Sequence, residues 1–592
     1  MNLQPPRSWA DFTSTNTLPP WEGIVAAAEL YLLYCDCQPL SLFDRDSFLS
    51  TLETRDPEIL LSMLALTSRF SDDASVRSNL TEIVKGYVNA ARAFVIRRLS
   101  NGPIELSTLQ SLCLLCLVDF TDGNTQRSSI NSTLAMGLAH GCGLSREGNM
   151  ALTAVAREDR RRCFWSICML KRLHGADFTV LDFAGEENFP WYPKSTGKPP
   201  VSASATPMAS QLAINNALGD KVDSGIVAYG IQLSEVWFKT TKYGRRRGKE
   251  SKLPPWSPQS EYATIMAQQM EFETRTPYTH RYKPANFSSK TAEELQSNRD
   301  YWGPWLFIQF LYHTNLCLLN HPLLLSLRLK TLTLTTVIPE IFLQHTSDLI
   351  SSHASWIIHY IDMLEAKSFK ISDPFLGHCA AIVATIYLQE SFKDGQGLRK
   401  EKHLNFAKCL KFIRDIGEQW PHVARIADKL QRLEDTVSAT YRASPNPLTP
   451  DRGLLIDLGL FWEILEYSSA SELTSTSTNQ LFGASLSQGR QGPESTEVSN
   501  ASALPEPTRL DTASRPRSAG RDIGGAGSME GAAGLLNLSM GGARVEMDAG
   551  MMGHDPFTYS NDELAVLAES FFQQRNGNGA SNIDEWWNTG NL

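Results

Sequence analysis

Residues Arg157–Gly175 read R-E-D-R-R-R-C-F-W-S-I-C-M-L-K-R-L-H-G, and this stretch decides the fold class. At helical spacing its apolar side chains point almost all the way round the axis. A helix of that kind is usually buried inside a larger helical body. We therefore interpret the stretch as the structural hub of an all-α protein. The hub side chains are Cys163, Phe164, Trp165, Ile167 and Leu170.

The charges of this stretch lie at its two ends. Glu158 and Asp159 are expected in the first helical turn, where acidic groups suit the positive end of the helix dipole. Lys171 and Arg172 are expected in the last turn, and Gly175 follows as a stop. We interpret the arginines at 160–162 as the charged shoulder of a structural helix.

Helical periodicity continues on both sides of the hub. Alternating patterning with tight turn signals is nearly absent, so the sequence predicts a helical bundle or a stacked helix array. For residues 80–99 we expect the buried side to hold Ile83, Tyr87, Ala91, Phe94, Val95 and Leu99. Further helices are expected from about Pro19 and over 59–70, 106–120, 130–140, 214–242, 262–273, 301–319, 347–367, 374–392, 399–419, 423–441 and 454–467.

The composition of the 592 residues is ordinary for a globular protein, and the net charge of −9 does not suggest a protein that coats nucleic acid. The N-terminus has no apolar secretory region. The best membrane candidate, Trp302–Leu327, carries interior polar groups that a spanning helix would bury in lipid, so we expect a buried helix of a soluble, intracellular protein. The ten cysteines suit a reducing compartment: Cys35, Cys37, Cys113, Cys116, Cys142, Cys163, Cys168, Cys317, Cys379 and Cys409.

The sequence contains none of the common motifs for catalysis or metal binding that we considered. The phosphate-binding G-x-x-x-x-G-K, the nucleophile G-x-S-x-G and the zinc-binding H-E-x-x-H are missing. Asp72-Asp73 lacks the third acid that a magnesium-dependent all-α enzyme needs. The cysteine pairs 35/37 and 113/116 lack the second pair of a zinc site and are interpreted as core residues. We expect no enzyme, no catalytic residue and no metal in this chain.

The composition divides the chain into four parts. Residues 1–17 are expected to be disordered, 18–467 form the helical domain, and 468–553 form a disordered Ser/Gly-rich linker. Residues 554–592 place aromatic side chains among acids, a composition typical of segments that dock on coactivators. The aromatic residues expected to contact a coactivator are Phe557, Tyr559, Phe571, Phe572, Trp586 and Trp587.

A run of basic residues follows the expected helix at 214–242. Such runs serve as nuclear-import signals or contact phosphate groups, and they also occur as plain solvated loops. The candidate residues are Lys242, Arg245, Arg246, Arg247, Lys249 and Lys252.

The order of these segments resembles the regulatory (middle-homology) domain of fungal binuclear-zinc-cluster transcription factors. The resemblance covers about residues 18–330, and its most specific part pairs S-T-L-A-M-G-L-A-H-G-C-G-L-S (132–145) with the stretch at 157–175. Other marks are L-P-P-W (18–21), D-P-E-I-L-L-S-M-L-A-L-T-S-R-F (56–70), L-P-P-W-S-P-Q-S-E-Y (253–262) and Y-H-T-N-L-C-L-L-N-H-P-L-L-L (312–325).

This resemblance implies an all-α regulatory domain in a nuclear regulator of RNA polymerase II genes, with a metabolic or secondary-metabolite gene cluster as one class of target. It also implies coactivator partners and homo- or heterodimers. The family's six-cysteine zinc cluster is not found in this sequence. Zinc and direct DNA contact are therefore expected only if such a cluster is missing from the gene model. The alternatives are a corepressor or scaffold that dimerises with a zinc-cluster factor, or an all-α enzyme with a polar pocket near the hub.

Overall fold

The computed structural model describes residues 18–148, 150–175, 189–195, 223–245, 253–332, 337–392, 396–443 and 456–468. Within these ranges the regular structure consists of α-helices and short 3₁₀ turns, with no strand. The prediction of an all-α fold is confirmed. The chain parts expected at 1–17, in most of the linker and at 554–592 lie outside the described residues.

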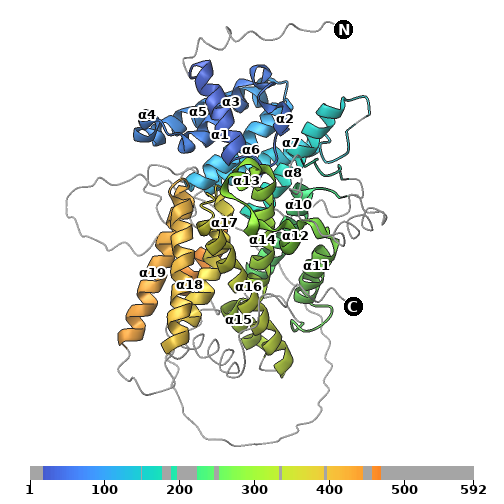
Figure 1. Cartoon of the computed structure of the whole chain (residues 1–592). Coiled ribbons are helices and arrows are strands. Elements are labelled where there is room, and N and C mark those ends of the chain that lie inside the picture. The colour runs from blue at the N-terminus through green and yellow to red at the C-terminus, as the bar shows by residue number, and fades with distance from the viewer. Residues whose placement is uncertain are drawn as a thin grey trace, which may run out of the picture. The chain divides into compact units, whose positions relative to one another are not determined.

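The first group of helices packs around α3 (Pro57–Thr67), in which every residue is buried. It contacts α1 (Trp21–Tyr34), α5 (Leu80–Asn101) and α6 (Leu106–Asp122), and α6 in turn contacts α7 (Thr125–Gly141) and α8 (Ala154–His174). These helices lie together in blue to cyan in Figure 1, with the short α2 (Arg45–Phe48) and α4 (Ala74–Ser78) beside them.

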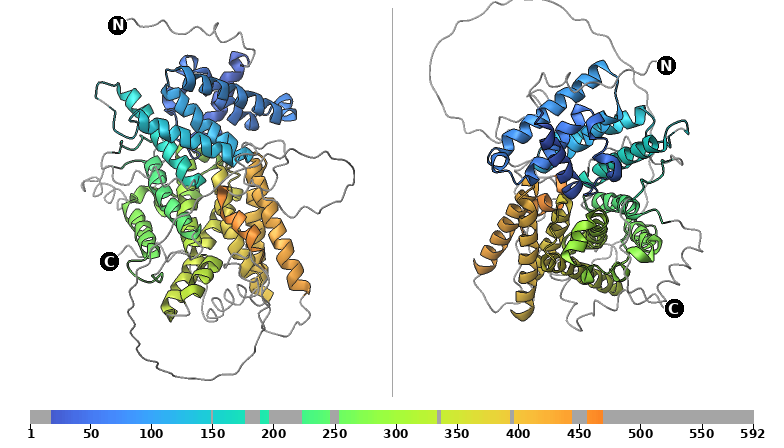
Figure 2. Two further views of the ribbon diagram at one scale, coloured as in Figure 1. Left: turned by 180° about the vertical axis from the view of Figure 1, so that it is seen from behind. Right: turned by 45° about the horizontal axis from the view of Figure 1, so that its top comes forward.

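The second group packs around α14 (Arg299–Leu319) and α17 (Pro374–Glu390). All residues of α17 are buried, and it contacts α14, α16 (Glu340–Ala366), α18 (Gln396–Gly417), α19 (Pro421–Ala443) and α20 (Leu458–Leu465). Helices α18 and α19 run side by side in Figures 1 and 2. The remaining members of this group are α10 (Ile226–Arg245), α11 (Glu261–Arg275), α12 (Tyr282–Ala285), α13 (Ala292–Ser297) and α15 (Pro322–Leu332).

Among the described helices, α8 packs on α10 and α6 packs on α19, and Arg299 of α14 also donates to the carbonyl oxygen of Leu33 in α1 (2.9 Å), so the two groups are joined at several places. One continuous cluster of buried hydrophobic side chains runs through both groups. Helix α8 therefore lies at the seam between them, while α17 contacts more helices than α8 does. The residues named as the hub are buried, with Cys163, Phe164 and Ile167 fully inaccessible to solvent.

Helix α8 begins three residues earlier than the charge pattern predicted. Thr153 is its N-cap, and the Thr153 hydroxyl accepts a hydrogen bond from the backbone N–H of Ala156. Glu158 consequently lies in the second turn rather than the first, and its side chain is buried. The expected interaction of Glu158 and Asp159 with the helix dipole was wrong, because the cap residue and not the acidic pair marks the start. Gly175 does end the helix, in the left-handed conformation with φ +67°.

The buried side of α5 is rotated from the predicted one by about one residue. Its buried residues are Val84, Val88, Ala91 and Val95, which follow the i, i+4, i+7, i+11 spacing of one helical face. Ile83, Tyr87 and Phe94 flank that face and are only half-buried. Ala91 and Val95 of the predicted side are buried, and Val84 and Val88 take the places expected for Ile83 and Tyr87 on the side that faces α3.

Residues 302–327 form parts of two helices instead of the single buried helix expected. Helix α14 ends at Leu319 and α15 starts at Pro322, where proline suits the first turn of a helix. Among the described residues, no helix has the length and apolar character needed to span a membrane.

The helix expected over 214–242 begins only at Ile226, after Gly225 with φ +85°, and residues 214–222 lie outside the described ranges.

Candidate regulatory site at the ends of helix α8

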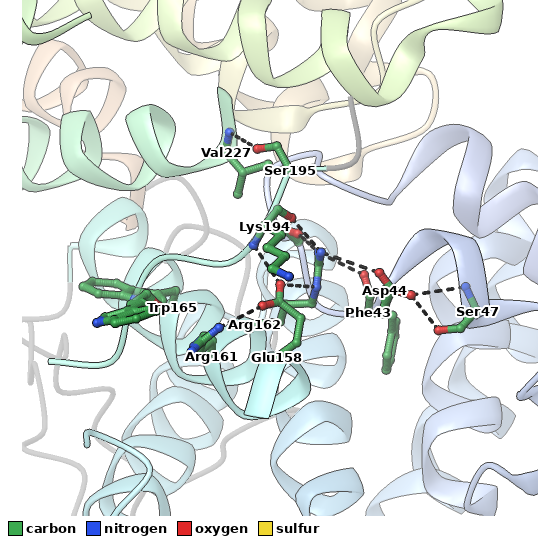
Figure 3. A network of polar contacts seen from close by, with 12 residues as sticks. Phe43, Asp44, Ser47, Glu158, Arg161, Arg162, Trp165, Lys194, Ser195 and Val227 are labelled. Carbon is green, nitrogen blue, oxygen red and sulfur yellow. Dashed lines mark hydrogen bonds and ion pairs between the residues drawn. The ribbon is translucent and has the colours of Figure 1, made fainter. Parts of the chain in front are cut away.

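Arg162 of α8 connects three separate segments of the chain. The Arg162 side chain is 3 % exposed, and its Nη1 donates to Ser41 Oγ (2.5 Å) and to the carbonyl oxygen of Phe43 (3.2 Å). Its Nη2 donates to the carbonyl oxygen of Lys194 (2.7 Å). Figure 3 shows this guanidinium between the Phe43–Ser47 segment and Lys194. A planar guanidinium with five donors is suited to holding several acceptors at once.

Acidic groups balance the charge of this buried arginine. Glu158 lies one helical turn before Arg162, and its Oε1 is 3.1 Å from Arg162 Nε and accepts the backbone N–H of Lys194 (2.8 Å). Asp44 Oδ1 is 3.8 Å from Arg162 Nη2. Burial raises the pKa of the Asp36 carboxyl to about 6, although Arg45 and Arg162 oppose that rise. The cluster therefore holds a buried cation that is paired with acids on two elements.

The same network continues to α10 through the segment 189–195. Ser195 Oγ accepts the backbone N–H of Val227 (3.1 Å), in the first turn of α10 (Figure 3). The indole N–H of Trp165 donates to the carbonyl oxygen of Trp191 (3.1 Å). Arg161 pairs with Glu147 (2.6 Å) and lies over the Trp191 ring at 5.2 Å. This end of α8 thus ties the segment 189–195 and the start of α10 to the first group of helices.

The other end of α8 is joined to the ends of α10 and α20. Arg245, in the last turn of α10, donates from Nη1 to the carbonyl oxygen of Gly175 (2.7 Å). Its Nε lies 3.3 Å from Glu466 Oε1, directly after α20. A Cβ at residue 175 would stand 2.3 Å from Arg245 Nη2, so the glycine also makes room for this guanidinium.

Tyr467 is buried in a cluster of aromatic rings and histidines beside Glu466. Its ring centroid is 4.6 Å from Phe120, 4.6 Å from His378 and 5.0 Å from His422. His174, the last residue of α8, stacks on Phe120 at 3.7 Å. Burial lowers the pKa of His174 and His378 to about 3 and moves that of His422 well below its usual value. We call Phe120, His174, His378, His422 and Tyr467 the Tyr467 cluster.

The arrangement ties helix α8 to its neighbours at both of its ends. Helix α8 has buried polar ties at its N-terminal end and the Tyr467 cluster at its C-terminal end. Arg245 thereby connects the residue after α20 with the ends of both α8 and α10. Buried networks of this kind hold one arrangement strongly, because a broken tie leaves a buried group without a partner.

The residues named from the sequence have different positions. Arg245 has a side chain that is 24 % exposed and makes structural contacts, and Lys242 is half-buried. Arg246, Arg247, Lys249 and Lys252 lie outside the described residues, as do all six aromatic residues of the C-terminal segment. Asp72 and Asp73 are exposed, and Asp72 pairs with Arg77. Nuclear import through the basic run and coactivator binding through the tail stay predictions.

Sequence reasoning missed Arg162 and Tyr467 as connecting residues. For Arg162 a signal existed, since Glu158 precedes it by four residues and the apolar run of the helix begins directly after it, as expected for an ion pair at the edge of the core. For Tyr467 no signal existed, because its partners come from α6, α8, α17 and α19 and meet only in the folded chain.

Comparison with known proteins identifies the region that contains this site. Residues 28–180 match the family model described as the fungal specific transcription factor domain. This region of the chain is similar to a fungal specific transcription factor domain. Arg162, Trp165 and all of α8 lie within the matched range, and the resemblance read from residues 132–145 and 157–175 is confirmed.

Relatives of this domain are similar over a longer range. A Zn(2)-C6 fungal-type transcription factor FTF1c from Fusarium oxysporum f. sp. lycopersici is 22% identical over 463 residues, which covers 73% of this chain and 48% of the relative. The transcription factor FTF2 from the same organism is 21% identical over 430 residues (69% and 39%). The uncharacterized transcriptional regulatory protein C530.11c of Schizosaccharomyces pombe is 22% identical over 470 residues (73% and 55%). The chain spans about half the length of these relatives. No solved structure matches it.

The relatives' names raise the question whether the cysteines of this domain could hold zinc. All ten cysteines lie within the described residues, and nine of them are buried. Nowhere in the described ranges do three or more His, Cys, Asp or Glu side chains converge as metal ligands would. Burial raises the pKa of Cys116 to about 12, which disfavours the thiolate that zinc requires. The cysteines of this domain do not fit a zinc cluster.

Proposed function

We propose that the chain regulates transcription of RNA polymerase II genes in a fungal nucleus, and that its helical body controls a C-terminal activation segment at residues 554–592. The family match and the relatives' names support the first part. The acidic-aromatic composition of residues 554–592 supports the second. Coactivators are the expected partners of that segment.

The observation that carries the control mechanism is the anchoring of Glu466 and Tyr467. The chain continues from these residues toward the activation segment. Tyr467 is buried, and Glu466 pairs with Arg245, which also holds the end of α8. In this proposal the anchor keeps the helical body in an arrangement that restrains the segment, and release of the anchor lets the segment act on coactivators.

A reporter experiment tests both parts. Residues 554–592 fused to a heterologous DNA-binding domain should activate a reporter gene, and residues 18–592 behind the same domain should activate it less. Glu466→Gln, which removes the charge that pairs with Arg245, should raise the activity of the longer fusion. Glu22→Gln on the exposed face of α1 is the control and should leave it unchanged. An inactive tail fusion would disprove the activation segment, and no effect of Glu466→Gln would disprove the anchor.

The alternative, a corepressor or scaffold that dimerises with a zinc-cluster factor, makes a different prediction for the same fusions. Both fusions would fail to activate, and the full chain would recover a zinc-cluster protein from nuclear extract. Target genes of the metabolic or secondary-metabolite class, which belong to the first proposal, are to be found by mapping the full chain on chromatin.

A further inference from the structure

A hollow of about 340 Å³ lies between the C-terminal ends of α16 and α18, on the opposite group of helices from the α8 network. Its apolar lining comes from both helices and from the turn after α16. A volume of this order suffices for a small organic molecule. The apolar lining residues are Ile361, Leu364, Phe369, Ile371, Phe412 and Ile416.

The turn after α16 shapes this hollow. Ser368 has the left-handed φ of +50°, which is unusual for a residue other than glycine. The backbone N–H of Phe369 bonds back to the carbonyl oxygen of Leu364 (3.1 Å), so the chain reverses and Phe369 becomes part of the lining. Arg299 lies over the Phe369 ring at 4.5 Å and donates to the carbonyl oxygen of Lys370 (2.7 Å). The lining is therefore held in place without a ligand.

The rim of the hollow is mixed in charge: three lysines border it, Lys370, Lys408 and Lys411, and the last two are paired with acids. Lys411 pairs with Glu365, and Lys408 pairs with Asp362 at 2.7 Å. Asp415 and Glu418 also border the hollow, and no described cation lies within ion-pair distance of either carboxylate. Burial, together with Glu418 and Glu365, raises the pKa of Asp415, while Lys411 opposes that rise.

Two helix ends add negative potential at the same place. Helix α16 ends at Ala366 and α18 ends at Gly417, and residues next to both ends border the hollow. The C-terminal end of a helix carries a partial negative charge and carbonyl groups without helical partners. Asp415 and Glu418 are acids at such an end, where they are unfavourable unless a cation is nearby.

We propose that this hollow, which we call the α16–α18 pocket, binds a small organic cation: an amine attached to an apolar body about the size of one aromatic ring. The apolar body would lie on Phe369 and Phe412, and the ammonium group would face Asp415 and Glu418. The positive charge of such a ligand would offset the negative charges of Asp415 and Glu418 and the partial negative charges of the two helix ends. This binding site stands independently of the proposed transcriptional role, because binding is measured directly.

Two compounds of equal shape and opposite charge test the proposal. Phenethylamine and phenylacetate are titrated into the full chain, and binding is followed by ligand-observed NMR. Phenethylamine should bind and phenylacetate should not. Asp415→Asn and Glu418→Gln keep the shape of each side chain and should each weaken phenethylamine binding by up to about fivefold, the effect of losing one exposed charge pair.

A charge reversal makes the test sharper. The double variant Asp415→Lys and Glu418→Lys should bind phenylacetate better than phenethylamine. Glu29→Gln on the exposed face of α1, which contributes no residue to the pocket, is the control and should leave phenethylamine binding unchanged. Equal binding of the two compounds, failure of both to bind, or insensitivity to Asp415→Asn and Glu418→Gln would each overturn the assignment of a cation site.

Discussion

Trp165 is the largest side chain of the α8 stretch, and its indole packs against Phe164 at 5.1 Å and Tyr192 at 4.7 Å. We expect Trp165→Ala to lower the free energy of unfolding by about 3–5 kcal/mol, because it leaves a cavity and removes the donor to Trp191. Trp165→Phe keeps most of the ring and should cost less. Chemical denaturation of the purified protein measures both, and a loss below ~1 kcal/mol for Trp165→Ala would show that Trp165 is not central to the core.

Arg162 gives a second expectation at the scale of one residue. Arg162→Met should lower the free energy of unfolding by about 3–5 kcal/mol, because Glu158 and the carbonyl groups of Phe43 and Lys194 stay buried without their donor. Arg162→Lys keeps the charge but loses the planar fork, and should cost about 1–3 kcal/mol. Denaturation of both variants at equal pH tests this order. Equal losses for the two would mean that the planar hydrogen-bonding geometry, and not the charge alone, is what Arg162 supplies.

These two residues also mark what sequence can foresee at this scale. The burial of Cys163 to Leu170 follows from local composition, since apolar side chains at every helical position leave no face for water. The role of Arg162 depends on Ser41, Phe43 and Lys194, which are distant in sequence. The local sequence pattern cannot identify such distant partners, so the three neighbouring arginines were interpreted as the charged shoulder of a structural helix.

At the scale of one element, α20 and the two residues that follow it pack on α17 and α19 through only a few buried side chains. Phe461, Ile464, Leu465 and Tyr467 are its buried residues. We expect Tyr467→Ala to cost about 3–5 kcal/mol of unfolding free energy and Tyr467→Phe much less, because the contacts are made by the ring. Amide hydrogen exchange measures the effect of the same substitution on α20 alone. Amides of residues 458–467 should lose protection in Tyr467→Ala before those of α17 do, and simultaneous loss would show that α20 does not open separately.

Element boundaries were predictable where a chemical signal marks them. Pro57 and Pro374 begin their helices as expected, and Gly175 ends one. The start of α8 was misplaced because the acidic pair at 158–159 looked like a first turn, while the cap is supplied by Thr153. The buried side of α5 was misjudged for another reason. The side of α5 that faces the core is set by its packing on α3, where valines and not phenylalanine are buried.

At the scale of the whole molecule, helical periodicity was enough to predict an all-α fold but not which helix lies at its centre. Helix α17 contacts five other helices, and its composition, rich in alanine and isoleucine, differs little from that of other buried segments. Centrality is a property of long-range packing, and periodicity within a window of residues does not carry it. The pocket between α16 and α18 was unforeseen for the same reason.

The many buried histidines give the molecule a pH dependence that no single helix shows. Burial lowers the pKa of six histidines in the folded chain, to about 3 for four of them. Below their ordinary value of 6.5, the unfolded chain binds protons that the folded chain excludes, so stability falls as pH falls. Asp36 and Asp373 have folded pKa values raised to about 6 and about 7 and act in the opposite direction over that window. Burial also raises the pKa of Glu58, Asp119, Asp159 and Asp415, by less than for the two aspartates and in the same direction. The six histidines, with their large shifts, outweigh these acids. The histidines are His174, His313, His321, His353, His378 and His422.

The free energy of unfolding therefore falls as the pH is lowered from about 6.5. Each proton that the unfolded chain binds and the folded chain does not contributes about 1.4 kcal/mol per pH unit to this fall. Denaturant unfolding at about pH 7 and about pH 5 measures that slope. His378→Phe keeps an aromatic ring beside Tyr467 and removes one titrating group, so it should reduce the slope by about one proton. His403→Gln changes an exposed side chain and should leave the slope as it is. A stability that is flat or rises on acidification would mean that the buried histidines become protonated within the fold, and that water or a carboxylate reaches the rings around Tyr467.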